Sequence, residues 1–264
     1  MSLLNENLLD QSDFVQDVYI TQTKTFSSIE YPYLIDIIKE HNVTSILDVG
    51  AGEGNFISGL AQLTPDVNYI AVEGDKKLVD KAKEKNAQGN ITFVNALFDE
   101  TFSNSSYDMI LARFAVEHMT DISQFVSEAM KRLKPGGVLL ITEYYCEFSD
   151  NDNEIWKLFR KKEIEMYVEL ASKPKTSIII PKRLKDAGFS NISSIFRHLT
   201  PTTIGHDNFY KTVISYVIAY NKMAPEIFTE KIKKEILDYC IKGQPESPDS
   251  EDRLFLTHTF GINA

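Results

Sequence analysis

Short apolar runs alternate with segments of helical periodicity along the first 145 residues of the chain. The apolar runs predict strands at 45–49, 69–73, 91–94, 107–112 and 138–143. The segments between them predict helices at 54–62, 76–85 and 121–133, the last of which ends at a Lys-Pro-Gly-Gly stop. Because the apolar runs lack polar alternation, we expect strands that are buried on both faces. The regular alternation of strand and helix predicts a doubly wound, mostly parallel α/β sheet.

The rest of the chain departs from this alternation and is mainly helical in pattern. Within 8–40, Pro32 is expected to open a helix that runs to His41. Beyond residue 145 we expect helices at 150–171 and 181–187, a strand at 191–199, two helices within 207–240 and a last strand at 253–260. The predicted organisation is one domain over 1–264, with a helical cover at 1–40, a core at 41–149, and a C-terminal part at 150–264 that carries helical lid insertions at 150–171 and 207–240.

Charge argues against a nucleic-acid partner. The chain has a formal charge of −10 and a pI near 5.1, and an acidic balance disfavours broad binding to nucleic acid. The densest basic cluster alternates with glutamates, so we interpret it as a solvated helix face; it consists of Lys157, Arg160, Lys161 and Lys162.

Cysteine content and hydropathy indicate in which compartment the protein is expected to work. Cys146 and Cys240 show no CxxC spacing, which predicts neither a metal site nor a disulfide framework. The first residues lack the basic and apolar regions of a signal peptide, and no apolar run approaches membrane-spanning length. We therefore expect a cytoplasmic protein without a membrane partner, either a monomer or a homodimer.

The stretch with the clearest chemistry is Ile46–Asn55, in which a buried strand ends in a glycine turn and enters a helix. Glycines at 50, 52 and 54 let the backbone turn sharply and approach a ligand closely. The free N–H groups of the following helix point at that ligand, and Asp48 reaches the same edge from the strand end. The turn is G-x-G-x-G, and Asn55 stands where a dinucleotide fingerprint has its last glycine.

Glu73 ends the second predicted strand, at the same edge of the sheet. A carboxylate there can accept hydrogen bonds from both hydroxyls of an adenosine ribose. The same logic holds for proteins that bind NAD, so Glu73 predicts a ribose rather than one particular cofactor.

Four motifs occur in order over roughly 42–145: the glycine turn, Glu73, Ala112–Met119 and Leu133–Gly137. The stretch Asn95-Ala96-Leu97-Phe98 follows the third predicted strand. Together the four motifs resemble the class I S-adenosylmethionine-dependent methyltransferases of the ubiquinone-biosynthesis-like, or type 11, group. The resemblance implies a seven-stranded Rossmann-like sheet and S-adenosylmethionine as cofactor, with the glycine loop around its amino-acid end. The cofactor residues it implies are Asp48, Gly50, Ala51, Gly52, Asn55, Glu73, Gly74, Asn95, Ala96, Leu97, Arg113, Phe114 and His118, with Asp99 competing for the adenine.

The acceptor side carries weaker signals. His118 and Glu143 are the candidates for a general base, although methyl transfer needs one only if the nucleophile must lose a proton. The expected substrate-pocket residues are Tyr19, Tyr144, Tyr145 and Trp156. Further polar candidates, for which a structural role is the more common alternative, are Arg197, His198, His206 and His258.

The predicted function is methyl transfer to an oxygen, nitrogen or carbon nucleophile of a small molecule. One alternative is a nicotinamide-dependent oxidoreductase, against which Asn55 and the absence of a Tyr-x-x-x-Lys pair weigh. Another is a non-catalytic partner protein that binds the cofactor without turnover.

Overall fold

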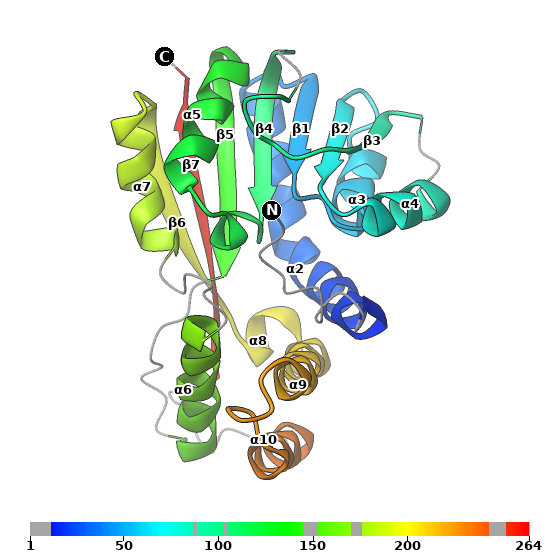
Figure 1. Ribbon diagram of the computed structural model, residues 1–264, viewed down its shortest axis with the longest axis vertical. Helices are drawn as coiled ribbons and strands as arrows, with labels where there is room; N and C mark the ends of the chain where they lie inside the picture. Colours follow the sequence, from blue (N-terminus) through cyan, green and yellow to red (C-terminus); the bar gives the residue numbers. More distant parts are fainter. Residues whose placement is uncertain are drawn as a thin grey trace.

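The computed structural model describes residues 12–86, 89–102, 105–144, 153–169, 176–242 and 252–263. Its centre is a seven-stranded sheet in the order β3-β2-β1-β4-β5-β7-β6 (Figure 1). The strands are β1 Ser45–Val49, β2 Asn68–Glu73, β3 Ile91–Asn95, β4 Tyr107–Arg113, β5 Leu133–Tyr144, β6 Ser190–Leu199 and β7 Leu254–Ile262. The first five strands pair in parallel, whereas β7 is antiparallel to both β5 and β6. The predicted seven-stranded, mostly parallel sheet is therefore confirmed.

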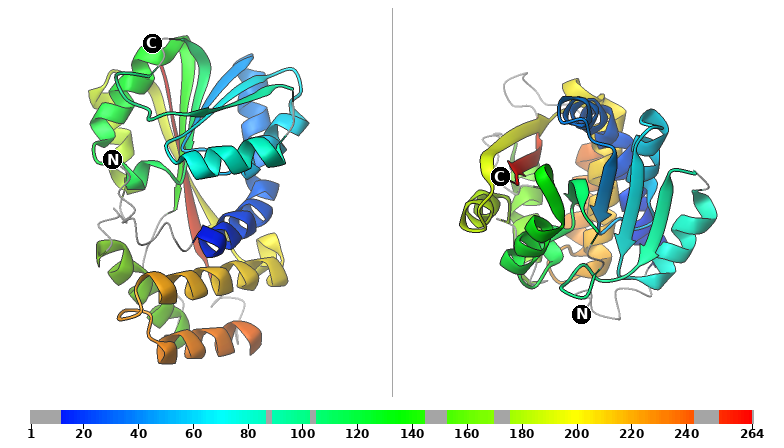
Figure 2. Two further views of the ribbon diagram at one scale, coloured as in Figure 1. Left: turned by 45° about the vertical axis from the view of Figure 1, so that its right-hand side comes forward. Right: turned by 90° about the horizontal axis from the view of Figure 1, so that it is seen from above.

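Helices cover both faces of the sheet, as the view from above shows (Figure 2). One face packs against α2 Ser12–Glu40, α3 Asn55–Leu63 and α4 Lys76–Lys85, and the other against α5 Ile122–Arg132 and α7 Thr176–Asp186. Successive residues of a strand point to opposite faces, so Met109 joins the first core and Ile110 the second. Both side chains are fully buried, in agreement with the uninterrupted apolar runs of the sequence.

Two prolines lie inside helices instead of opening them. The expectation that Pro32 starts a helix is wrong, because α2 runs through it without a break. Pro32 is exposed, and on the solvent side water can satisfy the carbonyl group that loses its N–H partner. Pro181 likewise lies within α7, which begins at Thr176 rather than near residue 181. The Pro-Gly-Gly stretch before residue 138 belongs to β5, which begins at Leu133.

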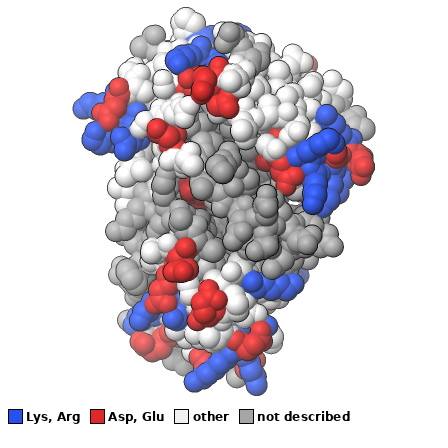
Figure 3. Space-filling model, viewed as in Figure 1, with Lys and Arg blue, Asp and Glu red and all other residues white. Residues whose placement is uncertain are grey.

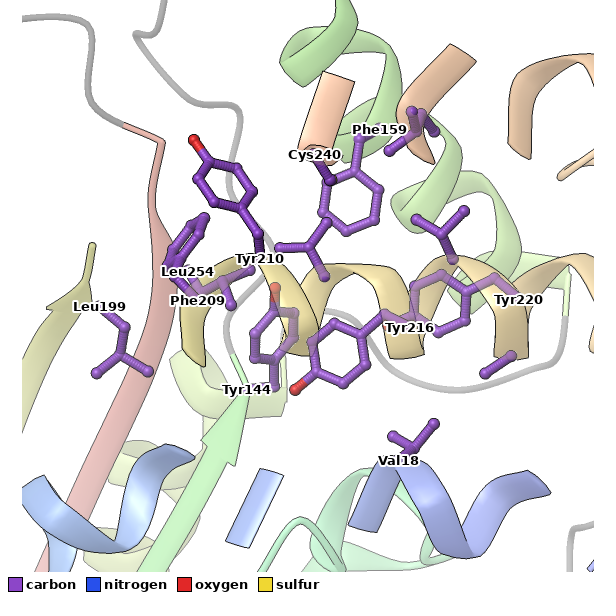
Figure 4. Packing of buried hydrophobic residues seen from close by; sticks show 14 of the residues in the cluster. Val18, Tyr144, Phe159, Leu199, Phe209, Tyr210, Tyr216, Tyr220, Cys240 and Leu254 are labelled. Carbon is purple, nitrogen blue, oxygen red and sulfur yellow. The ribbon is translucent and has the colours of Figure 1, made fainter. Parts of the chain in front are cut away.

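A second helical layer lies beyond the carboxyl ends of the parallel strands (Figure 1). It contains α6 Glu154–Glu169, α8 Pro201–Ile204, α9 His206–Met223 and α10 Glu230–Lys242. The helices α6, α9 and α10 lie largely within the segments 150–171 and 207–240, where lid insertions are predicted, whereas α8 lies outside them. The N-terminal half of α2 packs against this layer, and Val18, Tyr144 and Tyr216 share its core (Figure 4). The second helical layer thus has a hydrophobic core of its own.

One part of α6 contradicts the solvated face predicted for its charged residues. Arg160 and Glu163 are fully buried and form an ion pair. The Arg160 guanidinium also donates to the Tyr144 hydroxyl (2.6 Å), and the Tyr220 hydroxyl donates to the Glu163 carboxylate (3.0 Å). Burial is tolerated because each charge has an opposite charge and hydrogen bonds around it. Lys157, by contrast, is exposed as expected.

Surface charges of both signs are interleaved on the face shown in Figure 3, where Lys and Arg lie beside Asp and Glu over α4 and α7. No helix in the described ranges is long and apolar enough to span a bilayer. The described residues also contain no group of three or more His, Cys, Asp and Glu side chains that could hold a metal ion.

Candidate active site

A cavity of about 940 Å³ opens at the carboxyl edge of the parallel strands. Its walls come from the loops after β1, β2, β3 and β4, together with residues of α2, α4 and α5. Open α/β sheets bind ligands at this edge, where the helices that follow neighbouring strands diverge. The cavity therefore lies where the sequence places the ligand.

The glycine loop forms the floor of this cavity. Gly50, Gly52 and Gly54 all adopt positive φ, at 77°, 57° and 73°. A Cβ atom on Gly50 would lie 2.7 Å from the Ala115 Cβ, so the loop after β4 can pack here only against a glycine. A Cβ atom on Gly52 would meet nothing within 4 Å, which leaves open space above the loop for a ligand.

Glu73 holds the glycine loop from the end of β2. Its carboxylate accepts hydrogen bonds from the backbone N–H of Gly52 (3.0 Å) and of Asp75 (2.9 Å), and it lines the cavity. Asn95, which the sequence places in the cofactor site, is not among the cavity residues. Its side-chain amide donates to the carbonyl oxygens of Glu73 (3.0 Å) and Gly74 (2.9 Å), so it fixes the turn after β2 instead.

Asp48 lies in the cavity wall with only 4% of the residue exposed. Burial raises the pKa of its carboxyl group to about 7. Nearby Glu73 raises this pKa further, while the Arg113 guanidinium lowers it. A cationic ligand would favour the ionised form of Asp48 and so displace its proton.

The opposite end of the cavity is lined by Ala96, Leu97, Phe98 and Asp99. Of the two competing adenine partners, Asp99 reaches the cavity and Asn95 does not. The sequence reasoning did not find Gln124 and Phe125 of α5, which also line this end, because they lie within an ordinary amphipathic helix pattern.

Another wall of the cavity is formed by Tyr19 and Thr23 of α2 together with Phe114, Ala115 and His118 after β4. Tyr19 and His118, which the sequence suggests for the substrate and cofactor sites, thus both line the cavity. Two other expected substrate residues, Tyr144 and Trp156, are buried in the core of the helical layer and do not line the cavity. Tyr145 lies outside the described residues.

Glu143 lies behind this wall rather than in it. One carboxylate oxygen accepts the backbone N–H of Val116 at 2.8 Å, so it caps the short 3-10 helix Val116–His118. Burial raises the pKa of Glu143 well above its usual value, and neighbouring Glu117 contributes to this rise. The His118 imidazole, whose Nε2 lies 3.5 Å from the Glu117 carboxylate, is the titratable candidate that reaches the cavity.

The other polar candidates have structural surroundings. The Nδ1 atom of His258 in β7 lies 2.9 Å from the hydroxyl of Thr142 in the neighbouring strand β5. The rings of His198 and His206 contact Phe255 and Tyr210. Neither these histidines nor Arg197 line the cavity.

Comparison with known proteins agrees with this geometry. Residues 47–141 match the family model described as a methyltransferase domain. This segment of the chain is therefore similar to class I S-adenosylmethionine-dependent methyltransferase domains. The match contains the glycine loop, Glu73 and the loop after β4, which build three of the cavity walls.

Individual relatives are more distant. A ubiquinone biosynthesis O-methyltransferase of Rickettsia bellii is 25% identical over 154 residues, which cover 54% of this chain and 63% of that protein. The chain thus spans less than two thirds of that relative's length. The structure of a Haemonchus contortus phosphoethanolamine N-methyltransferase aligns with a TM-score of 0.52 at 19% identity, covering 83% of this chain and 48% of that one. The [4+2]-cyclase SpnF aligns with a TM-score of 0.54 at 17% identity, covering 87% and 79%. The two structures support the fold.

The residues present fit S-adenosylmethionine, the cofactor of this class. The open space above Gly52 accommodates a ligand against the backbone, and the Glu73 carboxylate faces the same cavity. Asp48 supplies an acidic group that suits a cofactor carrying a sulfonium and an ammonium group. Leu97 is 55% exposed beside this space and offers an apolar surface for a ring.

A buried partner of a cavity residue was also missed from the sequence. Glu30 of α2 is buried and forms hydrogen bonds with Arg113, which lines the cavity. The signal was present, because Glu30 lies midway between Phe26 and Leu34 at a spacing of four residues. A carboxylate on such an apolar helix face indicates a buried ionic partner.

Proposed function

We propose that this protein transfers a methyl group from S-adenosylmethionine to a nucleophilic oxygen, nitrogen or carbon atom of a small molecule. The cavity carries the proposal, since a single space joins the glycine loop and Glu73 to a wall of α2 and β4 residues. One end of it fits the cofactor, and the other leaves Tyr19, Thr23 and His118 available to an acceptor.

Each wall has a chemical role in this proposal. The bound cofactor would supply an electrophilic methyl group on sulfur. Gly52 leaves room for the amino-acid end, Asp48 balances positive charge, and Glu73 accepts hydrogen bonds from the ribose hydroxyls. Residues after β4 and on α2 hold the acceptor at attack distance and exclude water, which is the main requirement of a direct displacement.

The acceptor is proposed as a small molecule because the cavity is concave and lined by side chains from several elements. The similar proteins differ in acceptor atom: the Rickettsia relative is named an O-methyltransferase and the Haemonchus protein an N-methyltransferase. For an acceptor that must lose a proton, we propose His118 as the base, because its imidazole reaches the cavity whereas the Glu143 carboxylate does not.

Two alternatives remain in competition with this proposal. A nicotinamide-dependent oxidoreductase would use a similar sheet, but the domain match favours the methyltransferase. A cofactor-binding protein without methyl transfer is favoured by one observation, namely that a cyclase shares the fold. Binding and turnover must therefore be measured separately.

The decisive experiment has two stages. Calorimetry with S-adenosylhomocysteine and, separately, NADH should show binding of the first and none of the second. Incubation with methyl-labelled S-adenosylmethionine and metabolite extracts, followed by mass analysis, should then yield a labelled small molecule. Binding of NADH alone would contradict the proposal, and binding of S-adenosylhomocysteine without any labelled product would favour the non-catalytic alternative.

Three further expectations belong to the proposal. The helical cover closes over the acceptor, the protein acts as a monomer or homodimer, and it works in the cytoplasm. Closure can be checked by hydrogen exchange, in which the α2 segment 18–30 should gain protection when S-adenosylhomocysteine binds.

A further inference from the structure

An ion pair joins α2 to the end of β4 at the edge of the cavity. The guanidinium of Arg113 donates three hydrogen bonds to the Glu30 carboxylate, with lengths of 2.9, 3.0 and 2.8 Å. The side chains of Arg113 and Glu30 are only 9% and 1% exposed. A two-pronged contact of this kind fixes orientation as well as distance, so the pair holds α2 in one position against the sheet.

The same guanidinium is held between two aromatic rings. Its central carbon lies 4.2 Å from the centre of the Phe56 ring and 4.3 Å from that of Phe114. Phe56 follows the glycine loop at the start of α3, and Phe114 follows β4 with a positive φ of 52°. Arg113 therefore contacts three elements around the cavity at once: α2, the start of α3 directly after the glycine loop, and the loop after β4.

The position of α2 decides which of its residues reach the cavity. Tyr19 and Thr23 line the cavity, and Phe26 packs against Phe114 with ring centres 6.2 Å apart. These residues recur at helical spacing toward Glu30, so they lie along one face of α2. A rotation of the helix would move the whole face, and Glu30 lies at the point where this face meets the sheet.

The side of α2 next to this face is held by α9. The Gln22 side chain donates to the Tyr216 hydroxyl (2.9 Å), and the hydroxyls of Thr25 and Thr212 lie 2.8 Å apart. These contacts bind the N-terminal half of α2 to the helical layer.

The other half of α2 packs on the sheet side through buried Leu34 and Ile37, and the Tyr31 hydroxyl donates to the Phe56 carbonyl oxygen (2.8 Å). Within this frame the ion pair is the contact of α2 with the end of β4, so loss of Glu30 should loosen the cavity face of α2 without unfolding the helix.

We propose that Glu30 is a positioning residue of the methyl-transfer site, which holds the cavity face of α2 and the loop after β4 against the start of α3, directly after the glycine loop, through the Arg113 guanidinium. The proposal rests on the proposed function, because it concerns the same cavity. Glu30 itself does not line the cavity and acts through Arg113.

The charge of Glu30 gives a second observable, which distinguishes a positioning role from a contribution to stability alone. Arg113 is the positive group facing Asp48, and Glu73 is the negative one, while the Tyr69 hydroxyl also interacts with Asp48. The Glu30 carboxylate, which also interacts with Tyr31 and His258, offsets the charge of Arg113. Without that carboxylate, the uncompensated Arg113 should favour the ionised form of Asp48 at lower pH.

The test uses the full-length variant Glu30→Gln, with Glu40→Gln as the matched control on an exposed position of the same helix. Affinity for S-adenosylhomocysteine is measured by calorimetry between pH 5 and 9. We expect Glu30→Gln to bind S-adenosylhomocysteine about tenfold more weakly. The pH midpoint, at which half of the pH-dependent change in affinity has occurred, should fall by about one unit, the lower end of the range for a nearby opposite charge. Hydrogen exchange of residues 18–30 should be faster than in the wild type, while Glu40→Gln should match the wild type in every respect.

A second variant protects the test against a failure to fold. Arg113→Lys keeps both charges but loses the fork geometry, so it should speed exchange in 18–30 and leave the pH midpoint unchanged. Unchanged exchange in both variants, or an unchanged midpoint in folded Glu30→Gln, would overturn the inference. Absence of S-adenosylhomocysteine binding by the wild type would instead refute the proposed function.

Discussion

The buried carboxyl group of Asp48 makes a quantitative prediction about stability. Its pKa is about 7 in the folded protein, against an ordinary value of 3.8. The folded protein therefore binds this proton more tightly than the unfolded chain does. Between these two pKa values the folded state carries more protons, so the free energy of unfolding should fall as the pH rises.

The magnitude follows from the two pKa values. Each unit of difference corresponds to about 1.4 kcal/mol. Integration from pH 5 to pH 8 gives a loss of about 2.6 kcal/mol from this one group, because part of the total is already lost below pH 5 and the slope vanishes above pH 7. The substitution Asp48→Asn removes the titration and keeps the shape of the side chain.

The assay is urea unfolding of wild type and Asp48→Asn at pH 5 and pH 8. Other buried acids such as Glu117 and Glu143 titrate in both proteins, so their effects largely cancel in the comparison. The wild type should lose about 2 to 3 kcal/mol more than the variant between the two pH values. Parallel pH profiles, within about 0.5 kcal/mol, would refute the argument that desolvation sets the pKa of Asp48.

Three further predictions concern the glycine loop, the proposed ribose contact of Glu73 and the buried ion pair in the helical layer. Gly50→Ala should abolish S-adenosylhomocysteine binding in calorimetry, since its Cβ would overlap the loop after β4, whereas Gly89→Ala, which meets no atom within 4 Å, should bind normally. Glu73→Ala should weaken that binding by roughly 1.5–3 kcal/mol, the range for hydrogen bonds to a charged group, and unchanged affinity in a folded variant would exclude Glu73 as the ribose ligand. Arg160→Ala should lower the unfolding free energy by about 3–5 kcal/mol because Glu163 is left buried without its partner, and Arg160→Ala/Glu163→Leu should recover much of that loss.

The cofactor half of the site could be predicted because its chemistry is local in the sequence. A buried strand, a glycine turn and a helix lie next to one another in the chain, so the sequence alone assigns Gly52 and Glu73 to the ligand site, and both line the cavity. Residues at the carboxyl ends of parallel strands lie at one edge of the sheet, so their place can be predicted without knowing how the rest of the chain packs.

The acceptor half depends on contacts between distant segments. Tyr144 directly follows Glu143 at the end of β5, yet it points into the core of the helical layer, where it meets Arg160 of α6. Trp156 is buried in the same core. Neither orientation is encoded by local spacing, because both depend on how α6 and α9 pack. The pairing of Glu30 with Arg113 spans 83 positions, so the periodicity that marks Glu30 as buried does not identify its partner.

The place of β7 in the sheet has a consequence for how the protein is made. Residues 254–262 insert between β5 and β6, so a strand near the end of the sequence separates two strands that precede it. During synthesis, β6 has emerged from the ribosome well before the strand with which it pairs. The parallel strands β1 to β5 can associate as they emerge, whereas the β6 edge must wait for residue 262 with its backbone groups unpaired. An exposed edge of this kind is prone to wrong pairing, and chain elongation between residues 199 and 262 is therefore the step at which nascent-chain protection matters most.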